Sequence, residues 1–335
     1  MKSYYVQLNL LYKKLLSEGN VEKLSLKYTM EIMELLDDAN ANGEMVIQLF
    51  EGFEHCEATY ETVEGHSGST DFVKIIIKGT NGKLSGGNAP SLGIVGRLGG
   101  LGARPNRIGF VSDGDGAAAA VTIALKMANM SIKGDRLPGD VYVTTHICPS
   151  APTQPHEPVD FMGSPVDILT MNQYEVVQEM DAVLSIDTTK GNRVINHRGI
   201  ALSPTVKSGY VLKFCDDLLR IMEMTTGDLP VTFAVTTQDI TPYGNDIYHI
   251  NSILQPAVAT DAPVVGVAIT AKTAVPGCGT GASHEVDIAQ AVRFCIEVAK
   301  EYTQNQFEFY DVAEFKRLEK LYGSMKHLQT LGNEQ

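Results

Sequence analysis

The chain is poor in basic residues. Its 335 residues include 27 lysines and arginines against 40 aspartates and glutamates, so the formal net charge at pH 7 is -13. Such an excess of negative charge repels polyanions. The sequence therefore predicts no nucleic-acid partner and no adhesion to an anionic membrane.

Cysteine is also scarce. There are five cysteines, an odd number scattered along the chain, at positions 56, 148, 215, 278 and 295. This pattern is too sparse for a disulfide framework and favours a reducing compartment. We therefore expect a cytoplasmic protein.

Long hydrophobic runs are missing as well. No apolar run approaches the ~20 residues that a membrane-spanning helix needs. The first 19 residues mix Lys2, Lys13, Lys14 and Glu18 with leucines and tyrosines, and they contain no small-residue cleavage site. This favours an amphipathic helix over a signal peptide.

The composition that remains is typical of a packed core, with 44% hydrophobic and 20% charged residues. Helical periodicity dominates the start of the chain, where Ile32, Leu35 and Leu36 share a face. From Thr62 short β-rich runs separated by glycine loops follow. We predict an N-terminal helical segment over residues 1–60 and an α/β domain over residues 61–330.

The β-rich runs alternate with helical stretches, which indicates a mainly parallel sheet covered by helices on both faces. The expected strands are Phe72–Ile77, Leu92–Val95, Arg107–Val111, Val141–Thr145, Ala182–Ile186, Val231–Thr236 and Val264–Ile269. The expected helices are Ala117–Met130, Asp216–Met224, Val286–Glu301 and Val312–Leu321.

A glycine-rich run, Gly96 to Gly102, follows one expected strand and resembles a dinucleotide-binding loop. Such a loop works because a helix begins at its last glycines and meets the pyrophosphate. Here Pro105 and a returning strand leave no room for that helix. A nicotinamide or flavin oxidoreductase is therefore a distant alternative, and we expect the glycines to serve turns or close substrate approach.

Polar residues follow several expected strands at the points where they end. Asp113 and Asp115 follow one, His146 and Cys148 a second, and Asp187 a third. The carboxyl edge of an α/β sheet is where ligands bind.

His284 precedes the Val286–Glu301 helix. Carboxylates and imidazoles converging on one edge suit a divalent metal such as zinc. Each residue also has a simpler interpretation, since Asp113 and Asp115 can cap a helix, Asp187 can belong to a turn and His284 can neighbour an N-cap.

A separate cluster comprises His146, Cys148 and His156, with three prolines between the last two. A thiolate and two imidazoles can hold zinc, although a buried cysteine with two loop histidines is the commoner arrangement. If one of them is catalytic, His146 is the expected general base because its ordinary pKa lies near neutrality.

These residues together resemble the di-zinc exopeptidase superfamily of aminopeptidases and carboxypeptidases. The resemblance rests on Arg97-Leu98-Gly99, Asp113-Gly114-Asp115-Gly116-Ala117, Asp187 and Gly281-Ala282-Ser283-His284. It covers about residues 90 to 303 and implies a phosphorylase/hydrolase-like three-layer αβα sandwich. Almost end to end, the chain is also similar to a bacterial family catalogued as a domain of unknown function, through phrases such as Thr145-His146-Ile147-Cys148-Pro149.

The superfamily resemblance implies that Asp113 bridges two metals and that Asp187 and His284 are terminal ligands. The chain departs from the superfamily pattern at two places. Ile147 and Cys148 stand where paired glutamates are expected, and Arg97 stands where a histidine ligand is expected. A guanidinium does not bind a metal cation.

These departures favour one metal ion over two. Its expected ligands are Asp113, Asp187 and His284, with help from Cys148 or His146. Two alternatives stay open, a metal-free pocket and replacement ligands from His66 and His156.

We expect a metal-dependent hydrolase that acts on a small amide or peptide bond. His146 would move the proton, Arg97 or Arg198 would bind a substrate carboxylate, and His156 would also contact the substrate. The alternative is a protein of the same scaffold that binds a small ligand without turnover. Self-association into a homo-oligomer is a further expectation.

Overall fold

The structure is a computed structural model, and it describes residues 24–155, 160–189, 191–235, 249–273 and 283–330. Its centre is a mixed sheet in which the strands lie in the order β1-β2-β4-β3-β7-β11-β9-β10, with β8 also paired to β11. The strands are β1 (Cys56–Gly65), β2 (Gly68–Ile77), β3 (Leu92–Gly96), β4 (Val141–Ile147), β7 (Ala182–Thr188), β8 (Gly199–Leu202), β9 (Val206–Lys207), β10 (Tyr210–Val211) and β11 (Val264–Thr270). A separate two-stranded antiparallel sheet consists of β5 (Thr153–Gln154) and β6 (Phe161–Met162).

The middle of the sheet is parallel. β4, β3, β7 and β11 run in the same direction, whereas β1 and β2 on one side and β8 to β10 on the other pair antiparallel. Every residue of β3, β4 and β11 is buried, as strands covered on both faces must be.

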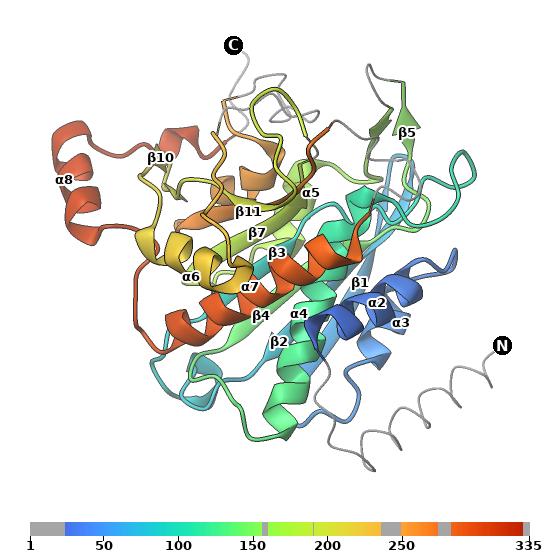
Figure 1. The fold of residues 1–335 in the computed structure, drawn as a ribbon, viewed down its shortest axis with the longest axis horizontal. Coiled ribbons are helices and arrows are strands. Elements are labelled where there is room, and N and C mark those ends of the chain that lie inside the picture. Colours follow the sequence, from blue (N-terminus) through green and yellow to red (C-terminus); the bar gives the residue numbers. More distant parts are fainter. Residues whose placement is uncertain (1–23, 156–159, 190, 236–248, 274–282, 331–335) are drawn as a thin grey trace.

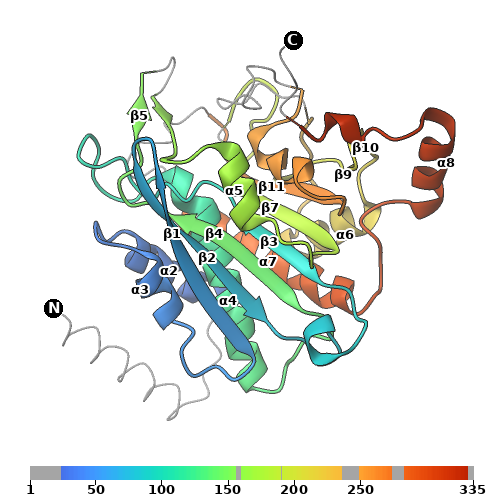
Figure 2. The ribbon, with the colours of Figure 1, turned by 180° about the vertical axis from the view of Figure 1, so that it is seen from behind.

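Helices cover both faces of this sheet (Figures 1 and 2). One face carries α2 (Ser25–Leu36), α3 (Gly43–Gln48), α4 (Asp115–Ile132), α6 (Asp216–Thr226) and α7 (Glu285–Thr303). The other face carries α5 (Ile168–Glu175) and the 3-10 segment Ser252–Val258. α8 (Val312–Tyr322) lies at the periphery, beyond β10 (Figure 1).

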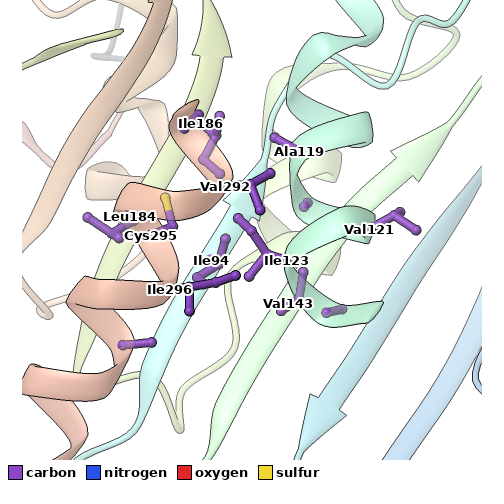
Figure 3. Close-up of a cluster of buried hydrophobic side chains, with 14 of the residues drawn as sticks. Ile94, Ala119, Val121, Ile123, Val143, Leu184, Ile186, Val292, Cys295 and Ile296 are labelled. Atoms are coloured by element: carbon purple, nitrogen blue, oxygen red, sulfur yellow. The ribbon is translucent and has the colours of Figure 1, made fainter. Parts of the chain in front are cut away.

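The largest hydrophobic core lies between the sheet and the helices α4 and α7 that cover one of its faces (Figure 3). Successive strand residues point to opposite faces, so Ile94 joins this core while Val95 joins the core on the other face. The alanines of α4 are almost completely buried, because small side chains let that helix approach the strands closely. Tyr28 and Ile32 of α2 belong to the same core.

The predicted fold class is confirmed. The chain forms a three-layer α/β sandwich around a largely parallel sheet. The four predicted helices match α4, α6, α7 and α8 to within a few residues, because each has clear periodicity. Among the described residues, no helix is long and apolar enough to cross a membrane.

Two predicted strands are wrong. Arg107–Val111 is an irregular loop in which Gly109 adopts a φ of 91°, a conformation that breaks an extended strand. Within 231–235, the predicted strand Val231–Thr236 reduces to a single bridge between Thr232 and Leu202. The structure adds β1, whose side chains are mostly exposed and therefore lack the apolar alternation that signals a strand.

Candidate functional site

The carboxyl ends of the parallel strands bring several of the predicted site residues to one edge of the sheet. Arg97 directly follows the last residue of β3, and Asp187 is the second-last residue of β7. The Arg97 N–H donates to the Ile186 carbonyl oxygen at 2.8 Å, so these two strand ends are directly joined. Asp187 is 1% exposed, and its Oδ1 accepts the Thr188 N–H at 2.6 Å.

The entry to α4 reaches the same edge. Thr188 Oγ1 donates to the Ser112 carbonyl oxygen at 2.6 Å, which joins the end of β7 to the segment that contains Asp113. Asp115 is the first residue of α4 and is completely buried. We name Asp113, Asp115 and Asp187 the acidic edge.

The entry to α7 meets the acidic edge through Ser283. Its hydroxyl donates to Asp115 Oδ1 at 2.5 Å, which brings residue 284 close to the start of α4. His284 is the N-cap residue of α7, its side chain is exposed, and it makes no side-chain cap hydrogen bond.

The N-cap residue of α4 is Gly114, so neither Asp113 nor Asp115 occupies that position.

The metal prediction needs side chains that converge on one point. In the part of the chain that the structure describes, no group of three or more His, Cys, Asp and Glu side chains is placed to hold a metal ion. Asp113, Asp187 and His284 therefore share an edge without forming a complete ligand set by themselves.

Arg97 takes part in a buried ion pair that the sequence did not predict. Its Nη1 lies 2.6 Å from Glu175 Oε2 and donates to Asn172 Oδ1 at 3.2 Å. Both partners come from α5, and the side chains of Arg97 and Glu175 are 3% and 0% exposed. In this arrangement the guanidinium contacts protein groups, and its role in binding a substrate carboxylate stays a prediction.

His146 shares the same glutamate. Its Nδ1 lies 2.5 Å from Glu175 Oε1, and its Nε2 accepts the Gly99 N–H at 3.1 Å. Because Nε2 accepts from Gly99, Nδ1 is the ring nitrogen that faces Glu175 as a donor. Both ring nitrogens are thus occupied, and the ring holds the glycine-rich loop against the end of β4.

The charge state of Glu175 follows from these contacts. Burial is the largest influence and acts to raise the pKa of its carboxyl, but Arg97 and His146 together hold that pKa below its ordinary value. The carboxylate therefore stays ionised between two donors. We name Arg97, Glu175, His146 and Asn172 the buried network.

The glycine-rich loop serves close packing of the chain on itself. A Cβ at Gly99 would lie 1.8 Å from the His146 carbonyl oxygen, so only glycine fits there. No helix begins at these glycines, since α4 starts at Asp115. In the structure Gly99 packs closely on the backbone of β4, and the expected close approach of a substrate stays a prediction.

Cys148 lies immediately after β4 in a small apolar cluster with Val111, Ala151 and Met162. It is 2% exposed, its Sγ donates to the Ser69 carbonyl oxygen at 3.8 Å, and burial raises the pKa of its thiol to about 11. A protonated thiol is a poor metal ligand, because the thiolate is the binding form. Its predicted role as a ligand stays untested.

The remaining predicted residues are dispersed. Arg198 is more than half exposed, and its Nε lies 3.3 Å from Asp287 Oδ2 at the start of α7, near the acidic edge. His66 lies in the exposed turn between β1 and β2, where its N–H donates to the Pro165 carbonyl oxygen. His156 lies outside the described residues.

Sequence reasoning missed Glu175, Asn172 and Ser283. Asn172 and Glu175 are three residues apart on α5 and therefore share a helix face. That spacing is a weak signal on its own. Their partner Arg97 lies 78 residues from Glu175 in the chain.

The fold and this edge define the class of protein as a three-layer α/β sandwich with an acidic carboxyl edge. The family model described as "Protein of unknown function (DUF1177)" matches residues 61–332, and the chain belongs to that family. No curated protein matches the chain. Among solved structures, it is similar to the LapA aminopeptidase of Legionella pneumophila, with 13% identity and a TM-score of 0.49 over 86% of this chain and 73% of that chain.

Proposed function

We propose that the protein is a metal-dependent hydrolase that acts on a small amide or peptide bond at the acidic edge, with an atypical site for one divalent ion, zinc being the expected one. The observation that carries the proposal is the placement of Asp113, Asp115 and Asp187 at the carboxyl end of a parallel sheet. Asp115 and Asp187 are almost completely buried there. Carboxylate oxygens are ligands that zinc accepts, and they also suit the ammonium group of a ligand.

The proposed reaction adds water to the carbonyl carbon and breaks the C–N bond, so that the departing nitrogen gains a proton. His146 carries that proton in the proposed scheme. Its Nε2 accepts the Gly99 N–H, so the glycine-rich loop must withdraw from the ring before Nε2 takes up a proton. Arg198, at the edge and largely exposed, binds the substrate carboxylate.

Elemental analysis tests the metal directly, on protein purified without a chelator. We expect about one divalent ion per chain, lost in Asp187→Ala and His284→Ala. Asp228→Asn is the matched control, because Asp228 is an exposed acid far along the chain from the edge. Metal-free wild-type protein, or retention of the ion in both edge variants, would contradict the proposed site.

A second candidate is a protein that binds a small ligand at the same edge without turnover. The buried network favours this candidate, because Arg97 and His146 already form hydrogen bonds with Glu175, Asn172 and Gly99. This candidate predicts that small peptides raise the melting temperature while no amide is hydrolysed. Turnover that a chelator abolishes would reject it in favour of the hydrolase.

A further inference from the structure

A pocket of about 820 Å³ lies far from the acidic edge, at the opposite end of the sheet. Its lining residues belong to α4, to α7 from Arg293 onward, to the end of α6 and to the first residue of α2. Figure 1 shows these helices side by side on one face of the sheet. Arg136 and Leu137, shortly before β4 begins, line it at the amino ends of the parallel strands. Its volume falls in the range of small-molecule sites.

The charge of this pocket is opposite to that of the whole chain. Four basic residues line it, Lys126, Arg136, Arg293 and Lys300, against two acidic ones, Asp135 and Glu297. The pocket therefore has an excess of two positive charges in a protein whose net charge is -13. Because most of the surface repels anions, the pocket is a local exception.

Two of these cations form no ion pair with an acid in the part of the chain that the structure describes. Lys300 pairs with Glu297 at 2.6 Å, but no salt bridge within the described residues includes Arg136 or Arg293. Arg136 Nη2 donates only to the carbonyl oxygens of Lys78 and Gly79, at 3.2 and 3.4 Å. Its Nε is buried and has no hydrogen-bond partner in that part of the chain. Charge without a counter-charge attracts an anion, and guanidinium groups match carboxylates and phosphates in shape.

The rest of the lining is mixed, with Ser25, Thr225 and Gln304 beside four apolar side chains. Met130, Leu137, Met224 and Ile296 contribute to the walls. Such a surface suits the hydrocarbon part of a ligand, whereas a fully hydrated anion gains nothing from it. The site thus combines a cationic part with an apolar part.

We propose that this pocket binds a small amphipathic anion, with its carboxylate or phosphate head near Arg293 and Arg136 and its hydrocarbon body against Met130 and Ile296. The site is distinct from the acidic edge, which lies at the carboxyl ends of the same strands. It therefore stands whether or not the protein is a hydrolase.

Calorimetric titration of the full chain with hexanoate, hexyl phosphate and neutral 1-hexanol tests this site. We expect both anions to bind and the alcohol to bind at least about tenfold more weakly. The preferred anion identifies the head group as carboxylate or phosphate. Equal affinity for the alcohol and the anions, or no binding of either anion, would overturn the proposal.

Variants locate the binding. Arg293→Gln should weaken anion binding about tenfold, because it removes one charged donor. Arg317→Gln is the matched control, since Arg317 is also an exposed helical arginine, on α8, and does not line the pocket. Unchanged affinity in Arg293→Gln, or an equal loss in both variants, would contradict the site. Loss in Arg198→Gln instead would place the anion at the acidic edge and overturn it too.

Discussion

At the scale of single residues, the buried network depends on one carboxylate. Glu175 is fully buried and accepts hydrogen bonds from Arg97 and His146. Removing one partner of a buried ion pair is costly, because the other charge stays buried without compensation. Glu175 is thus the residue on which the local arrangement of β3, β4 and α5 depends most.

Glu175→Gln keeps the size of the side chain and removes its charge. We expect the free energy of unfolding to fall by about 3–5 kcal/mol, as for other broken buried ion pairs. Urea denaturation followed by circular dichroism measures this change. Glu179→Gln is the control, because Glu179 is exposed on the same stretch of chain; an equal and small effect in both variants would contradict the importance of the network.

The same residue predicts a pH dependence of stability. The folded-state pKa of Glu175 lies below the ordinary value of 4.5, so its carboxylate stabilises the folded protein fully above that pH. This contribution is lost as the pH falls through the folded-state pKa. Denaturation between pH 6 and about pH 3 should show a smaller acid-induced loss in Glu175→Gln than in the wild type. Parallel curves for the two proteins would speak against a depressed pKa.

Cys148 offers a test of a different kind. Since burial raises the pKa of its thiol to about 11, almost no thiolate forms at neutral pH. We expect iodoacetamide to leave Cys148 unmodified in the folded protein and to label it in denaturant, as measured by peptide mass spectrometry. Fast labelling of the native protein would show that the thiol is accessible and ionised, as a metal ligand or nucleophile requires.

At the scale of elements, the position of the acidic edge depends on how closely α4 packs on the strand ends. A Cβ at Gly116 would lie 2.1 Å from the Arg97 carbonyl oxygen and 2.8 Å from that of Ile186. Both oxygens belong to the backbone and cannot move without shifting β3 or β7. Gly116 therefore fixes the distance between α4 and the edge.

Gly116→Ala should lower the free energy of unfolding by about 1–3 kcal/mol or more, the usual cost of overpacking. Thermal denaturation measures the loss. Gly163→Ala is the matched control, because the nearest atom to its added Cβ would be 3.5 Å away. Equal melting temperatures for the two variants would show that α4 is free to move away from the sheet.

The elements differ in how well the sequence predicts them. The central strands β3, β4, β7 and β11 are mostly apolar and are evident from the sequence, whereas β1 is exposed and carries no such pattern. The edge follows from the general rule that parallel strands end together, so the neighbourhood of Asp187 and Arg97 is predictable. The partners are not, because Glu175 reaches Arg97 only through the packing of α5 on the far face of the sheet.

At the scale of the whole molecule, the acidic edge and the basic pocket lie at opposite ends of the parallel strands. The carboxyl end holds Asp113, Asp115 and Asp187, and the amino end holds the basic pocket with Arg136 and Arg293. The net charge of -13 is thus not spread evenly, since the basic pocket is lined by more cations than acids.

The proposed function is hydrolysis of a small amide or peptide bond at the acidic edge with a metal ion. Its most direct test is turnover of a panel of dipeptides and N-acyl amino acids by the wild-type protein, measured as released amine before and after treatment with a chelator. We predict hydrolysis that the chelator abolishes, that zinc restores, and that Asp187→Ala lacks. No hydrolysis of any member of the panel by metal-supplemented wild-type protein would contradict the account.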